Sequence, residues 1–196
     1  MASLISFVLG VALLAVELEP RATLRVASDA MLGYLRTLDS TLKLLNVTGK
    51  ATYVPHGSQV IMVMAGANSP VDLPPVGAGI HDEIVGELGD SAQKGPDFFD
   101  LWIPRILVDN LSLSDEVKVS REGTGVRISM KRPFVRRLCV DPFVNANVCC
   151  RMGCPLAGSV AQNLALTSGR EVQFENCTYD PGTQLAETRL TLGKSG

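Results

Sequence analysis

The chain has 196 residues, 46% of them hydrophobic, with 18 Lys and Arg against 20 Asp and Glu. This length favours one domain, and the apolar content excludes an intrinsically disordered chain because it suffices for a buried core. The net charge of -2 provides no overall positive field, so we expect no nucleic-acid partner. The two histidines leave little material for a histidine metal site.

Residues 1–19 form a hydrophobic segment of their own. Residues 2–16 carry no charge, and a helix of that length extends about 22 Å, which is less than the core of a bilayer. No basic residue precedes this run, which argues against a secretory signal peptide. A membrane anchor is the leading interpretation, while a buried core helix and the end of a longer hydrophobic segment stay open.

Two patterns disagree about the orientation of such an anchor. Arg21 and Arg25 follow the segment closely, which favours a cytoplasmic domain because positive residues are retained on that side. Three glycosylation triplets, which begin at Asn46, Asn110 and Asn176, favour the opposite side. We give the arginines slightly more weight and expect a membrane-anchored chain with a cytoplasmic domain.

Apolar residues recur every three or four positions between residues 23 and 45, which predicts an amphipathic helix. In one interpretation this stripe packs on the domain's own sheet. In the other it is a homodimer seam, because several of its members also lie seven residues apart. The members are Leu24, Met31, Leu35, Leu38, Leu42 and Leu45.

A hairpin is predicted next, with strands at residues 51–55 and 59–64. The second strand is apolar on both faces, so it should be central in its sheet. Residues 66–79 are rich in Pro and Gly and predict a loop. A short helix follows, with apolar residues on one face between residues 80 and 88.

The middle of the chain predicts a second helix and a second hairpin. The helix begins near residue 97, with Pro104 at the start of its regular part. The period then changes to two over residues 117–130, where apolar residues alternate with basic and hydroxyl residues. This alternation is typical of a hairpin with one buried face.

The last predicted unit is again a helix followed by a hairpin. Residues 155–168 form the helix, and Gly169 stands where a left-handed cap belongs. Residues 172–192 form the hairpin around a turn at Asp180. The sequence therefore predicts an α+β domain over residues 20–196, with helices covering antiparallel hairpins, preceded by an N-terminal hydrophobic helix.

The five cysteines are the main candidates for chemistry. Neither C-x3-C nor C-x4-C spacing matches a structural zinc knuckle, so we expect no metal site. Free buried thiols are the leading interpretation, and disulfides stay open because they occur in extracytoplasmic domains. A helix N-terminus can activate a thiol, but no general base is evident beside the cysteine that precedes Pro155. The candidates for thiol or disulfide chemistry are Cys139, Cys149, Cys150, Cys154 and Cys177.

No catalytic arrangement is evident elsewhere. A G-x-S-x-G elbow, a phosphate-binding loop and a dinucleotide fingerprint are all missing, so we expect neither a catalytic residue nor a cofactor. His56 and His81 are explained as solvent-exposed polar residues. The densest basic group either is a solvated face or contacts anionic lipid head groups. This basic group comprises Lys131, Arg132, Arg136 and Arg137.

Four short motifs are spread over most of the chain: Tyr53-Val54-Pro55, Leu73-Pro74-Pro75-Val76-Gly77, Ile106-Leu107-Val108-Asp109, and Gly153-Cys154-Pro155 with the run that ends at Val172. In this layout the chain resembles an uncharacterised archaeal family of membrane-associated domains. The resemblance implies an N-terminal membrane helix, an α+β domain and an archaeal source, and it implies no activity. The cysteines are not part of this pattern.

The tail carries a second resemblance through Gly169, Val172, Glu175 and Cys177. This helix-and-strand unit is similar to the end of the 4-vinyl-reductase type of small-molecule-binding domain. The spacing differs by one residue, and the second half of that signature is missing. The similarity implies a hydrophobic ligand pocket, for which the space between the last helix and the sheet is the expected place.

These observations predict a membrane-anchored domain that binds a partner or a ligand without catalysis. A thiol- or metal-dependent enzyme that uses Cys149, Cys150 and Cys154 is the alternative from another class. A ligand-binding sensory module is a third possibility, which an enclosed apolar cavity would favour.

Overall fold

The structure is a computed structural model that describes residues 20–66, 69–88, 96–141 and 148–193. The elements in chain order are α2 (Pro20–Leu44), β1 (Thr52–His56), β2 (Gln59–Ala65), β3 (Pro70–Leu73), α3 (Ala78–Leu88), α4 (Pro96–Arg105), the π-helix η3 (Ile106–Asn110), β4 (Glu116–Glu122), β5 (Gly125–Lys131), α5 (Arg136–Val140), α7 (Cys150–Met152), α8 (Pro155–Ser168), β6 (Val172–Asp180) and β7 (Leu185–Leu192). The three predicted hairpins and the helices before them are confirmed.

All seven strands form one sheet with the order β3-β2-β1-β6-β7-β5-β4. Every pair of neighbours is antiparallel. The first hairpin joins the last through β1 and β6, so segments from both ends of the described chain share a ladder. The predicted class, helices on antiparallel hairpins in an α+β arrangement, is therefore confirmed.

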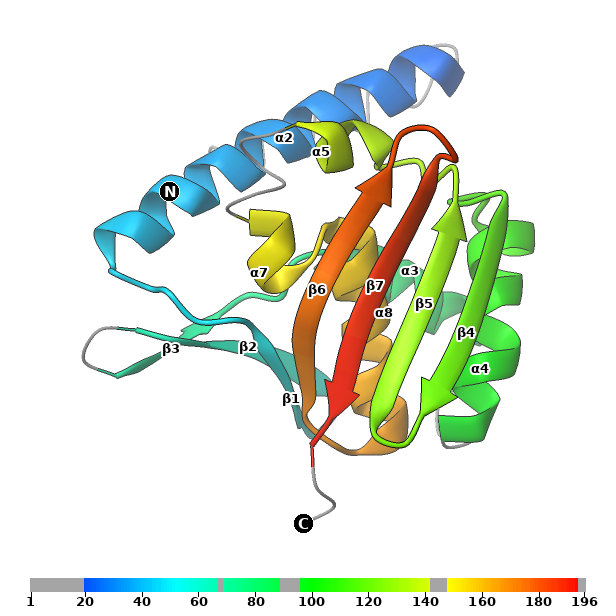
Figure 1. Cartoon of the computed structure of the whole chain (residues 1–196). Coiled ribbons are helices and arrows are strands. Elements are labelled where there is room, and N and C mark those ends of the chain that lie inside the picture. Colours follow the sequence, from blue (N-terminus) through cyan, green and yellow to red (C-terminus); the bar gives the residue numbers. More distant parts are fainter. Residues whose placement is uncertain (1–19, 67–68, 89–95, 142–147, 194–196) are drawn as a thin grey trace.

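Helix α8 lies at the centre of the core. It contacts β1, β2 and β6 on one side, and it contacts α3 and α4 on the other. Figure 1 shows α8 behind the sheet, with α2 crossing one end of the molecule. Because α8 is covered on all sides, residues 155–165 are all buried. This burial explains why small residues stand where a surface helix would carry charges.

The open face of the sheet shows the predicted alternation. In β5, Val126, Ile128 and Met130 are buried, while Arg127 and Lys131 are exposed. In Figure 1 one face of β4 to β7 is turned to the viewer, and no described helix covers it. The hairpin with one buried face is therefore confirmed.

Two local predictions are wrong. Residues 70–73 of the expected loop instead form the edge strand β3, which pairs with β2, so that β2 has a neighbouring strand on each side as its two apolar faces predict. Pro104 does not begin a helix but lies inside α4, one residue before its end. A proline there provides no backbone N–H, and the chain continues as the wider helix η3.

The predicted anchor, residues 1–19, lies outside the described residues, and with it the N-terminal hydrophobic helix of the expected fold. None of the helices in the described part of the chain combines the length and the apolar composition that crossing a bilayer requires.

Candidate functional site

An apolar groove of about 620 Å³ lies between α2, α3 and the beginning of α8. Met31 and Tyr34 line it from α2, and Ile80 and Glu83 line it from α3. Residues 74–79, which comprise the connection after β3 and the first two residues of α3, form a third wall with Pro155 of α8. Leu111 and Leu113, just after η3, complete the lining. We call this cavity the apolar groove.

The wall at residues 74–79 rests directly on the backbone of α8. Gly77 has a φ of +83°, and a Cβ atom there would lie 1.9 Å from the carbonyl oxygen of Pro155. A Cβ atom at Gly158 would lie 2.2 Å from the carbonyl oxygen of Val76. The Gln162 side chain donates a hydrogen bond of 3.0 Å to this same oxygen. These contacts hold the wall in place, so the groove is preformed.

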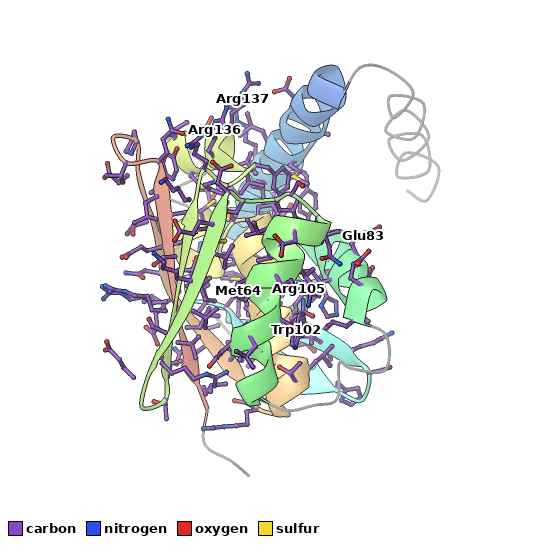
Figure 2. All side chains as sticks on the ribbon, turned by 90° about the vertical axis from the view of Figure 1, so that its right-hand side faces the viewer. Met64, Glu83, Trp102, Arg105, Arg136 and Arg137 are labelled. Carbon is purple, nitrogen blue, oxygen red and sulfur yellow. The ribbon has the colours of Figure 1, made fainter. Side chains whose placement is uncertain are left out.

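Two polar side chains line this groove, Tyr34 from α2 and Glu83 from α3. Tyr34 is 51% exposed, and partial burial raises the pKa of its phenol. Glu83 is exposed on α3, as Figure 2 shows. Neither side chain has a hydrogen-bond or ion-pair partner within the described part of the chain, so both remain available to a ligand.

Sequence reasoning missed the groove. Its residues come from five segments between positions 31 and 155, and they meet only after folding. The one sequence feature that indicates the groove is the Pro- and Gly-rich run at residues 66–79, for which the sequence predicts a loop. The expected cavity between the last helix and the sheet is not where the groove lies, because Leu156, Val160 and Leu164 of α8 are fully buried in the core.

The five cysteines lie close together in the fold, although the sequence spreads them over 39 positions. Cys154, the cap of α8, is in hydrogen-bond contact with Cys139 of α5 and with Cys177 of β6. The Cys150 thiol approaches the carbonyl oxygen of Cys177 at 4.0 Å. Cys149 is buried nearby, within electrostatic range of Cys154. We call these five residues the thiol cluster.

Three thiols of this cluster, those of Cys149, Cys154 and Cys177, are poor nucleophiles. The hydrogen bond with Cys139, together with burial, raises the pKa of Cys154 to about 12. The hydrogen bond with Cys154, together with burial, also raises the pKa of Cys177 well above that of an ordinary thiol. Burial raises the pKa of Cys149 in the same direction. These thiols are protonated at neutral pH, and the helix N-terminus at Cys154 does not offset this shift.

None of the five cysteines, all of which lie within the described ranges, forms a disulfide bond. Only Cys150 is partly exposed. Within the described ranges, no group of three His, Cys, Asp or Glu residues is arranged to hold a metal ion.

The two histidines differ. His56 is exposed in its hairpin turn, as predicted. The prediction for His81 is wrong, because only 8% of this residue is exposed and its Nδ1 atom has no partner among the described groups. Its ring contacts Asn163 of α8. Ile80 and Glu83, which lie before and after His81 on α3, line the groove, and the buried His81 ring joins this wall to the core helix α8 through Asn163.

The basic group is exposed, and two of its four members lie in ion pairs. Arg132 forms an ion pair of 3.1 Å with Asp115, and Arg137 lies 3.9 Å from Asp29 of α2. Figure 2 shows Arg136 and Arg137 at the end of the molecule where α2 begins. The neighbouring carboxylates reduce the positive charge of this surface, although the group does lie beside the point where residues 1–19 join the domain.

The α2 stripe packs mainly on its own domain. Leu35 and Leu42 are fully buried, and Met31 and Leu38 pack partly against the core. Leu45 is 48% exposed. The first member of the stripe stands where no side chain is described. Two central members are therefore unavailable to a second copy, which supports the first interpretation of the stripe.

Comparisons of the chain with protein families, with curated proteins and with solved structures find no match.

Proposed function

We propose that this chain is a membrane-anchored, non-enzymatic module that binds an apolar ligand in the groove between α2 and α3. The observation that carries the proposal is the groove itself. Its volume of about 620 Å³ falls within the range of about 300–1,000 Å³ that is typical of small-molecule sites. Its lining, mostly apolar with two polar groups, is also typical of such sites.

Membrane anchoring through residues 1–19 fits the position of the groove. These residues lead directly into α2, which supplies one wall. Met31 follows Pro20 by eleven residues, about 17 Å along a helix. The groove would then lie close to the membrane surface, with Arg136 and Arg137 on the same end of a cytoplasmic domain. A ligand that partitions into lipid could reach it over a short distance.

The resemblances support the same proposal. The likeness to an archaeal membrane-associated family suggests an anchored domain, and the likeness of the tail to the 4-vinyl-reductase type of domain suggests a hydrophobic ligand. The alternative, a thiol- or metal-dependent enzyme, is not favoured. Its proposed residues belong to the thiol cluster, whose members Cys149 and Cys154 are buried with raised pKa values.

Anchoring is tested with the full chain and a matched pair of variants. Replacing Leu9 and Leu13 by Glu places two charges in the apolar segment, and we expect the protein to leave the membrane fraction. Leu101→Glu is the control, because this leucine is 78% exposed on α4 and the same type of substitution adds a negative charge outside the apolar segment. Unchanged membrane fractionation of the double variant would contradict anchoring by residues 1–19.

Ligand binding is tested separately, with a neutral apolar fluorescent probe such as N-phenyl-1-naphthylamine. Ile80→Glu puts a charge into the groove wall and should abolish probe binding. Leu101→Glu should bind the probe as the wild type does. If Ile80→Glu remains folded by circular dichroism and binds the probe normally, the groove is not the binding site.

A further inference from the structure

We infer that the ligand of the apolar groove ends in a cationic amine, held between the Tyr34 ring and the Glu83 carboxylate. This inference rests on the proposed function, because it concerns the same groove. It adds the chemical class of the ligand, a small amphiphile with an apolar chain and an ammonium group.

The chain of such a ligand is matched by the walls. Met31, Ile80, Leu111 and Leu113 offer aliphatic surface, and the third wall consists largely of Pro and Gly. Burying apolar surface contributes about 25 cal/mol per Å², without selecting one chain over another. The apolar lining therefore provides affinity, and selectivity must come from the polar groups.

The amine is matched by the charge of Glu83. Among the described residues that line the groove, Glu83 is the only one with a charged side chain. In the part of the chain that the structure describes, no Lys or Arg pairs with it. Its helix neighbour Glu87, by contrast, accepts a hydrogen bond of 2.5 Å from Asn110. A ligand ammonium would form an ion pair with the Glu83 carboxylate, whereas a ligand carboxylate would be repelled by it.

The aromatic ring across the groove favours the same group. Tyr34 lies on the α2 wall and faces the cavity with about half of its surface exposed. An ammonium within about 6 Å of an aromatic ring is attracted by its π face. A ring on one wall and a carboxylate on the other is a combination that recognises cations, and a neutral ligand would use neither group fully.

The experiment measures the binding of three probes with the same chain length to the full-length protein: n-decylamine, n-decanol and n-decanoate. Isothermal titration at pH 7, below micellar concentrations, gives the affinities. We expect decylamine to bind about three- to tenfold more tightly than decanol, and decanoate to bind most weakly. Equal affinities for the three probes would overturn the inference and leave the proposed function standing.

Charge variants of α3 show which residue causes the preference for the amine. Glu83→Gln should weaken decylamine binding about three- to tenfold and change decanol binding by less than about twofold. Glu83→Lys should reverse the preference toward decanoate. Asp82→Asn is the control, because it removes the same charge from the adjacent exposed residue, which does not line the groove. If Glu83→Gln and Asp82→Asn have equal effects, a general surface charge explains the preference and the inference is wrong.

The ring is tested independently. Tyr34→Phe keeps the π face and should retain amine selectivity, whereas Tyr34→Leu should lose about two- to fivefold of it. If none of the three probes binds the folded wild type, the proposed function fails together with the inference. A dimer that Ile80→Glu dissociates, seen by sedimentation without amine binding, would show that a second copy occupies the groove and would overturn both.

Discussion

The apolar groove and the thiol cluster lie on either side of the first turn of α8, and they differ in what they offer to a ligand. Cys154 belongs to the cluster, and the next residue, Pro155, lines the groove. The cluster contains the most reactive residue type of the chain, but a hydrogen bond with Cys139 and burial raise the pKa of Cys154, and burial raises that of Cys149. The groove contains ordinary residues, but it is open and preformed. Accessibility and shape, more than residue type, therefore identify the candidate site.

Gly158→Ala should have the largest effect on stability and on probe binding, because the added methyl group disrupts the contact between α8 and the groove wall. A Cβ atom at this position would lie 2.2 Å from the carbonyl oxygen of Val76 and 2.9 Å from the Tyr53 hydroxyl. We expect a loss of about 3 kcal/mol or more in the free energy of unfolding, together with loss of probe binding. Urea denaturation and fluorescence titration measure the two effects.

Gly79→Ala is the matched control on the same wall. A Cβ atom there meets nothing within 4 Å, and the residue belongs to α3. Its stability should be unchanged or higher by up to about 1 kcal/mol, because alanine favours a helix. If Gly158→Ala is as stable as this control, the groove wall does not depend on its backbone contact with α8.

The difference between the two regions also shows how far the sequence could be interpreted. The elements were predictable because their signals are local, as with the alternation in β5 and the left-handed cap at Gly169, whose φ is +62°. The free thiols were predictable from the burial preference of cysteine. Their assembly into one cluster was not, because Cys139, Cys154 and Cys177 meet only when α5 and β6 pack against the N-terminus of α8.

The groove was unpredictable for the same physical reason, and the burial of His81 was missed with it. Whether a polar side chain near Asp82 is exposed depends on which face of α3 meets α8. That face is decided by tertiary packing of α3 on an all-buried helix. A single short amphipathic stretch does not contain this information.

Acid should destabilise the region of the groove, through protonation of His81, before it affects the stability of the thiol cluster. Burial lowers the pKa of His81, with the Asp82 charge opposing this shift only in part. As the pH falls below about 6.5, the unfolded chain binds a proton that the folded chain binds less readily. Stability therefore decreases toward acid, by at most about 1.4 kcal/mol per pH unit for this one group.

Two histidine variants check the origin of that slope. His81→Gln should flatten the decrease in unfolding free energy between pH 7 and pH 5, and His56→Gln should retain it because His56 is exposed. Urea titrations at several pH values provide the comparison. An equal slope in the wild type and in His81→Gln would show that other groups cause the acid sensitivity.

The thiol cluster should act as packing, with an effect of intermediate size. Cys177 is 3% exposed, and its sulfur accepts a hydrogen bond of 3.6 Å from Thr188. Cys177→Ala should cost about 1 kcal/mol of unfolding free energy, as expected for a small buried hydrophobic group. Cys150→Ala, at the partly exposed member, should cost less than about 0.5 kcal/mol.

Thiol labelling gives an independent measurement of the same contrast. In the native protein, a disulfide reagent should modify Cys150 first, and the four buried thiols should react only as the protein unfolds. Rapid native labelling of all five thiols would contradict the structural role. It would also restore the thiol-dependent enzyme as a candidate.

Glu83→Gln should have the smallest effect on stability, which separates a binding residue from a structural one. Because Glu83 is exposed and pairs with no described side chain, its loss should change the free energy of unfolding by less than about 0.5 kcal/mol. Glu87→Gln, which weakens the bond to Asn110, is the comparison on the same helix. A cost above 1 kcal/mol at Glu83 would assign it to the fold. An unchanged free energy of unfolding together with altered amine binding would show that the Glu83 charge serves binding and not folding, unlike the buried residues of the thiol cluster.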